Sequence, residues 1–113
     1  MAPFRLLTVN TVPERAKRVI ARIVDEVKGD WEILHVGNVE RIEDVQAAVT
    51  REQPDVLFTA SMWTPEQAQE IVALAKGVKP ELRTLSMPQG LQAERGPDGV
   101  VLYVKEKLPE LLG

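Results

Sequence analysis

Five polar residues of this chain fall at the ends of successive apolar runs: Asn10, Thr11, Ser61, Ser86 and Lys105. If those runs are parallel strands, their carboxyl ends meet at one edge of a sheet and the five side chains converge there. Such a pocket suits a small anion, held by Lys105 and by free amides at helix N-termini. The alternative is that these polar groups bond one another and cap loops, with no ligand involved.

The residue types that catalysis needs are not gathered at any recognisable spacing. The chain has no cysteine and a single histidine, His35, which no Ser/Asp pair accompanies at a triad-like spacing. We expect His35 to lie in a strand with its polar atoms satisfied. Neither a glycine-rich phosphate loop nor a metal-binding spacing is present. We therefore expect no enzyme activity, no cofactor and no metal.

Length and charge limit the function classes further. The 113 residues suit a single domain over 1–113, and 14 basic against 17 acidic residues give a net charge of −3, which disfavours direct nucleic-acid binding. No signal peptide and no apolar run near the roughly 20 residues of a membrane span is visible. We expect a cytoplasmic protein without membrane contact.

Strand-like and helix-like segments alternate along the chain, which is typical of βαβ units and a parallel sheet covered on both faces. The expected strands are 5–10, 31–36, 55–60, 82–87 and 100–104, and the expected helices are 13–28, 41–52 and 64–76. Thr64-Pro65-Glu66-Gln67 has the form of a capping box. The pair Gly37-Asn38 is expected to form a turn.

The last quarter of the chain fits this pattern less well. Residues 88–99 barely suffice for a parallel crossover through a short helix, and Gly96-Pro97-Asp98-Gly99 equally suits a hairpin turn. We take the fifth strand as parallel and keep an antiparallel edge strand as the alternative. Residues 105–113 are too short for a full helix, and Pro109 shortens it further.

Short final helices would leave apolar side chains uncovered. The side chains concerned are Val101, Tyr103, Leu108, Leu111 and Leu112. We therefore expect a partner-binding surface here, used by a homodimer through residues 90–113 or by a docked protein.

Met62 and Trp63 directly follow the third expected strand. They suit either an exposed anchor for a partner or a lid packed over the pocket. The charged face that begins the first helix, formed by Glu14, Arg15, Lys17 and Arg18, is expected to be solvated.

The order of these segments resembles a response-regulator receiver domain. The resemblance rests on Leu6 to Pro13, on Asp30 to Ile33 with the following helix, on Gln53 to Leu57, and on Pro97 to Leu102. It implies a flavodoxin-like, doubly wound three-layer α/β/α sandwich with five mainly parallel strands in the order 2-1-3-4-5. It also implies a signalling module with a protein partner or a fused output domain.

The resemblance places the family's reactive residues on positions that cannot perform its chemistry. The two acidic residues after the first strand correspond to Asn10 and Thr11, and the phosphoacceptor aspartate corresponds to Ala60. The switch hydroxyl falls on Ser86 and the family's lysine on Lys105. We expect a degenerate, phosphorylation-independent pseudo-receiver that acts through protein contact, and a small-ligand sensor at the polar edge is the alternative. The sequence does not decide between a stand-alone module and part of a longer protein.

Overall fold

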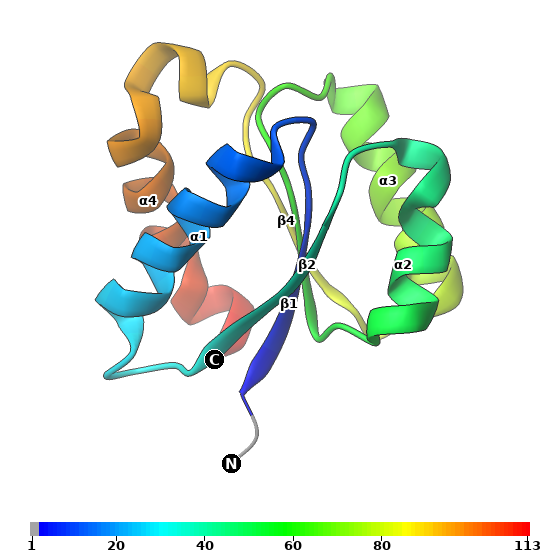
Figure 1. The fold of residues 1–113 in the computed structure, drawn as a ribbon, viewed down its shortest axis with the longest axis horizontal. Coiled ribbons are helices and arrows are strands. Elements are labelled where there is room, and N and C mark those ends of the chain that lie inside the picture. Colours follow the sequence, from blue (N-terminus) through cyan, green and yellow to red (C-terminus); the bar gives the residue numbers. More distant parts are fainter. Residues whose placement is uncertain (1–2) are drawn as a thin grey trace.

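The computed structural model describes residues 3–113 and contains one sheet of four parallel strands in the order β2-β1-β3-β4 (Figure 1). The strands are β1 (Phe4–Val9), β2 (Ile33–Val39), β3 (Val56–Thr59) and β4 (Arg83–Ser86). The helices are α1 (Pro13–Val27), the short 3-10 helix η1 (Ile42–Asp44), α2 (Val45–Glu52), α3 (Pro65–Val78) and α4 (Leu91–Leu112).

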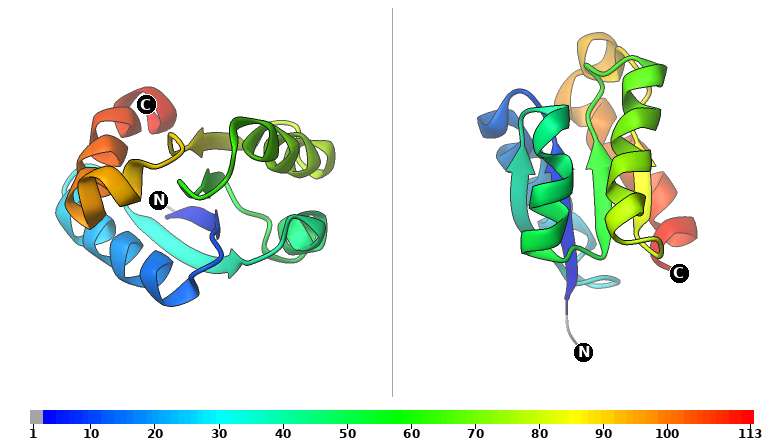
Figure 2. Two further views of the ribbon diagram at one scale, coloured as in Figure 1. Left: turned by 90° about the horizontal axis from the view of Figure 1, so that it is seen from above. Right: turned by 90° about the vertical axis from the view of Figure 1, so that its right-hand side faces the viewer.

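The helices cover both faces of the sheet. Helices α1 and α4 pack together on one face, and α2 and α3 pack together on the other (Figures 1 and 2). Because side chains alternate along a strand, Leu6 enters the core beneath α1 and α4, whereas Leu7 enters the core beneath α2 and α3. The expected doubly wound α/β/α sandwich is therefore the observed fold.

The start of α3 forms as its sequence predicts. Thr64 Oγ1 accepts a hydrogen bond from the Gln67 amide at 3.1 Å, and Gln67 Oε1 accepts one from the Thr64 amide at 3.0 Å. This reciprocal pair is a capping box, and Pro65 occupies a first-turn position where no amide is needed. The loop after β3 is thereby joined rigidly to α3.

The turn expected at Gly37-Asn38 is wrong, because β2 runs on to Val39. The pairing of β1 with β2 steps from Leu6–His35 to Leu7–Gly37, which leaves Val36 as an extra residue. Because of this bulge, each later side chain of β2 points to the opposite face of the sheet from the one that regular alternation would give it. Asn38 therefore lies on the same face of the sheet as His35.

The fifth strand is also wrong, because residues 100–104 form part of α4. Gly96, at φ 67°, breaks the helical geometry, and Pro97 begins the second helical segment in the position that proline favours. The buried residues of that segment are Val100, Val101, Val104, Leu108 and Leu112. Their spacing is helical, and it continues beyond the short apolar run that suggested a strand.

Helix α4 also removes the basis of the expected dimer surface in residues 90–113. Leu108 is fully buried in the domain's own core, and Val101 and Leu112 are buried beside it. Tyr103 and Leu111 are half-buried against the same core. The exposed apolar residue of this helix is instead Leu102, at 54% exposure. Leu108 and Leu112 therefore stabilise the fold and are not available to a partner.

Within residues 3–113, no helix has the length and apolar character required to cross a membrane.

Candidate functional site

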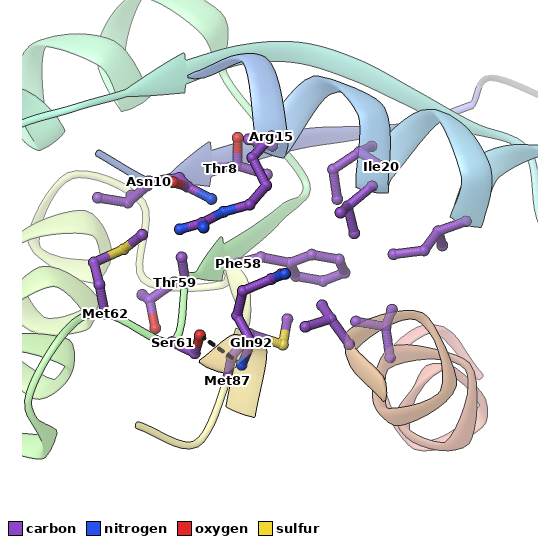
Figure 3. A pocket seen from close by; sticks show the side chains of 17 residues that line it. Thr8, Asn10, Arg15, Ile20, Phe58, Thr59, Ser61, Met62, Met87 and Gln92 are labelled. Carbon is purple, nitrogen blue, oxygen red and sulfur yellow. Dashed lines mark hydrogen bonds between the residues drawn. The ribbon is translucent and has the colours of Figure 1, made fainter. Parts of the chain in front are cut away.

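A small cavity lies near the carboxyl ends of β1 and β3, under the helix layer of α1 and α4 (Figure 3). Its volume is about 50 Å³. That is far below the roughly 300–1,000 Å³ of pockets for drug-sized ligands. Its inner wall is apolar and includes Ile20, Phe58 and Val104. The cavity has room for water or a small ion, but not for a nucleotide.

The structure brings some of the expected pocket residues together. Asn10, Ala60, Ser61 and Met62 all line this cavity. Thr11 is exposed in the turn before α1 and is not part of the lining. These placements join the ends of β1 and β3 in one site.

Two further expected pocket residues lie elsewhere. Ser86, at the end of β4, lines a separate groove beside α3. Lys105 lies on the exposed side of α4, where its Nζ donates to Glu26 Oε1 at 2.9 Å. This contact with Lys105, followed by the hydrogen bond from Arg22, lowers the pKa of the Glu26 carboxyl below its ordinary value. Lys105 therefore joins α4 to α1 and is not the cation of the cavity.

Ser61 performs a structural task. Its hydroxyl accepts a hydrogen bond from the amide of Gln92 at 3.1 Å, and its carbonyl accepts one from the amide of Gly90 at 2.9 Å (Figure 3). Both amides belong to the start of α4, where the first N–H groups have no partner within the helix. Ser61 thus caps a helix that follows it by 31 residues, as the loop-capping alternative expects.

A partly buried polar network joins β1 and β2 on one face of the sheet. The Thr8 hydroxyl donates to Asn38 Oδ1 at 2.7 Å and lies 2.9 Å from His35 Nε2. Because the Thr8 hydroxyl donates its single proton to Asn38, the His35 Nε2–H is the donor in the hydrogen bond between His35 and Thr8. Asn38 in turn donates to the carbonyl of Asn10 at 3.0 Å. The bulge in β2 makes this network possible because it turns His35 and Asn38 to one face.

Burial lowers the pKa of His35 below its ordinary value of 6.5, and a hydrogen bond with the backbone of Gly37 opposes that change only in part. The neutral imidazole is therefore the form that the fold favours. His35 is a structural residue of the network, as its isolation in the sequence predicts.

Trp63 lies outside the cavity. Its side chain is 8% exposed and packs in the core beneath α2 and α3, and its Nε1–H donates to the carbonyl of Val9 at 3.0 Å. A buried indole with its N–H satisfied cannot serve as an exposed anchor. Met62 is half-buried and, unlike Trp63, lines the cavity.

Sequence reasoning missed Arg15. This residue lies in the first turn of α1, is half-buried, and points its guanidinium into the cavity (Figure 3). The signal that could have identified it is position, because a residue two places after Pro13 lies in the helix turn directly above the end of β1. Arg15 supplies the positive charge that Lys105 was expected to provide.

The donor atoms around the cavity do not fit magnesium. Asn10 and Ser61 offer neutral oxygens, Ala60 offers none, and no carboxylate is among the lining residues. In proteins Mg²⁺ keeps several waters and is held by one or two carboxylates together with phosphate oxygens. The guanidinium of Arg15 would also repel a cation at this position.

Solved structures with a fold similar to this one include receiver domains and a response regulator. The signal receiver domain of the putative response regulator NarL from Mycobacterium tuberculosis superposes with a TM-score of 0.60 at 14% identity, over 94% of this chain and 79% of that chain. The isolated REC domain of RcsB from Salmonella enterica serovar Typhimurium, in the presence of the phosphomimetic BeF3-, gives 0.58 at 13% identity, over 92% and 73% of the two chains. A structure of the RcsB response regulator from Salmonella typhimurium gives 0.62 at 14% identity, over 98% of this chain and 64% of that chain.

These likenesses show a receiver fold with four strands in place of the five expected. At 13–14% sequence identity, these structural similarities are evidence for the fold and not for the function. Neither a scan against models of known protein families nor a search of curated proteins found a match.

Proposed function

We propose that the chain is a receiver-like signalling module that acts through protein contact and without phosphorylation. The observation that carries the proposal is the set of side chains at the carboxyl edge of the sheet. Asn10 and Ala60 meet at the cavity without a carboxylate, and the Ser61 hydroxyl is already used to cap α4. Neither a phosphoryl acceptor nor a ligand for Mg²⁺ stands where the fold would use one.

Commitment of the polar groups to structure supports the same proposal. A site that exchanges a metal and a phosphoryl group needs side chains that are free to bind them. At the cavity, the Thr8 hydroxyl instead donates to Asn38, and the Ser61 hydroxyl accepts from the amide of Gln92. A module of this kind signals through its surface, to a protein partner or to a fused output domain, and has no enzymatic step.

Thermal unfolding with Mg²⁺ tests the proposal. A ligand at a hundred times its dissociation constant would stabilise the fold by about 2.7 kcal/mol. We expect millimolar Mg²⁺ to leave the melting temperature where sodium chloride of equal ionic strength leaves it. A rise that is specific to Mg²⁺ would contradict the proposal.

A second function, a sensor of small anions, is favoured by the position of Arg15 at the cavity. Inorganic phosphate would then raise the melting temperature of the wild type but not that of Arg15→Gln. Arg18→Gln is the matched control, because Arg18 is exposed on the same helix. Equal responses of all three proteins to phosphate would exclude the sensor.

A further inference from the structure

The guanidinium of Arg15 lies at an apolar cavity without an acidic partner. None of the ion pairs within residues 3–113 includes Arg15, and no carboxylate lines the cavity. The side chain is half-buried and points its guanidinium inward (Figure 3). A partly desolvated arginine whose donors are unused is a binding group for an anion, because its planar fork matches the two oxygens of a carboxylate.

Two side-chain amides add further donors to the same cavity. Asn10 Oδ1 accepts a hydrogen bond from the Val12 amide at 2.7 Å, which leaves Asn10 Nδ2 without a partner among the described residues. The side chain of Gln92 makes no hydrogen bond there either, although its backbone amide is held by Ser61 Oγ at 3.1 Å. Both side chains line the cavity. Its unused polar groups are therefore mainly N–H donors, which suit a negatively charged ligand.

The other end of the cavity is apolar. Asn10, Arg15 and Ser61 lie toward one end, and Ile20 lies toward the other (Figure 3). Cavities with apolar walls remain dry, and a phosphate ion placed there would have oxygens without donors, which is unfavourable. A ligand that fits both ends has one charged group and one apolar group.

The volume of the cavity limits that apolar group to a few carbon atoms. A space of about 10–15 Å³ accommodates one water-sized group, so a volume of about 50 Å³ accommodates roughly three to five of them. Acetate and propionate are of this size. Acids with an aromatic ring or a long alkyl chain exceed it.

We propose that the cavity binds the anion of a short aliphatic carboxylic acid, with its carboxylate on Arg15 and its alkyl group against Ile20 and Phe58. The inference rests on the second proposed function, the sensor of small anions, and names the class of anion. Phosphate also reaches Arg15, but it leaves the apolar end unfilled. Burial of one CH₂ group strengthens binding about fourfold, so a carboxylate gains affinity from its alkyl chain and phosphate does not.

Titrations followed by NMR test the class of ligand. The probes are the sodium salts of formate, acetate and propionate, with sodium phosphate for comparison and sodium chloride of equal ionic strength as the baseline. We expect the affinity to rise about fourfold with each added carbon from formate to propionate, and propionate to bind more tightly than phosphate. The side-chain NH₂ signals of Asn10 and Gln92 should shift as propionate binds, because both groups line the cavity.

Two pairs of variants test the two ends of the cavity. Arg15→Gln should weaken the binding of propionate by about tenfold or more, since a hydrogen-bonded charge is lost, whereas Arg18→Gln, exposed on the same helix, should leave it unchanged. Ile20→Val enlarges the apolar end by one CH₂ group and should move the preference from propionate to butyrate. Ile71→Val makes the same change in the core beneath α2 and α3 and should not alter the preference.

An affinity that does not depend on the alkyl chain, or that is higher for phosphate than for propionate, would overturn this inference. If Arg15→Gln still removes that binding, the sensor of small anions would stand without it. Equal losses in Arg15→Gln and Arg18→Gln, or Asn10 and Gln92 signals that no anion shifts, would overturn the inference and the sensor together. None of these results bears on the absence of phosphorylation, which the response to Mg²⁺ tests separately.

Discussion

Ala60 lies at the cavity beside Asn10, where a receiver would need carboxylates. The Ala60 amide donates to the carbonyl of Val9 at 3.1 Å and so holds the ends of β1 and β3 together. In the proposed function, the side chains of Asn10 and Ala60, and not the backbone around them, account for the absence of phosphorylation.

Restoring those side chains should restore the metal site. Asn10→Asp, Thr11→Asp and Ala60→Asp together place several carboxylates near the cavity, and each raises the pKa of the others. We expect the triple variant to lose roughly 1–3 kcal/mol in the free energy of unfolding at neutral pH, and to regain it with Mg²⁺. Thr11→Asp alone is the control, because Thr11 is exposed. If Mg²⁺ does not change the stability of the triple variant, the side chains at positions 10, 11 and 60 do not meet at one site.

His35 should make the stability of the domain depend on pH. Its pKa is lower in the folded protein than the ordinary value of 6.5. Between the folded pKa and pH 6.5 the unfolded chain binds more protons at His35 than the folded protein does. The free energy of unfolding therefore rises with pH across this window, and the domain loses this stability when the solution is acidified. His35→Gln retains a donor toward Thr8 and does not titrate. Urea unfolding at several pH values should therefore show the loss in the wild type and not in this variant.

At the scale of elements, the sequence predicts best where a local signal fixes the structure. Pro13 and the Thr64 capping box locate the starts of α1 and α3, and short continuous apolar runs locate β1 and β3. The errors fall where local and long-range signals compete. Gly37-Asn38 has the composition of a turn, yet the bulge at Val36 and the bonds of Asn38 keep it within β2.

Helix α4 is the larger error, and its stability is open to test. Val100 to Val104 has the composition of a strand, but it lies in a helix whose buried residues Val100, Val104 and Leu108 pack in one core with α1. Leu108→Ala should lower the free energy of unfolding by about 2–5 kcal/mol, because it leaves a cavity in the core. Leu102→Ala should change it by less than about 0.5 kcal/mol. Denaturant titration compares the two, and similar effects would argue against the helical register of α4.

At the scale of the whole molecule, the alternation of segments predicted the sandwich and the parallel strands, but not their number. The fifth strand and its crossover are replaced by the two helical segments of α4, which leaves β4 at the edge of the sheet. The candidate site was predicted in part. Asn10, Ala60 and Ser61 follow from the ends of strands, whereas Arg15, two places after Pro13, was expected on the solvated face of the first helix.

The proposed absence of phosphorylation is tested most directly by the intact mass of the protein after incubation with a small-molecule phosphodonor and Mg²⁺. The triple aspartate variant, treated in parallel, shows whether the conditions are permissive. We predict that the mass of the wild type does not change, because neither a carboxylate acceptor nor a magnesium ligand lines the cavity. An increase by one phosphoryl group that requires Mg²⁺, and that maps to the ends of β1 or β3, would contradict the account.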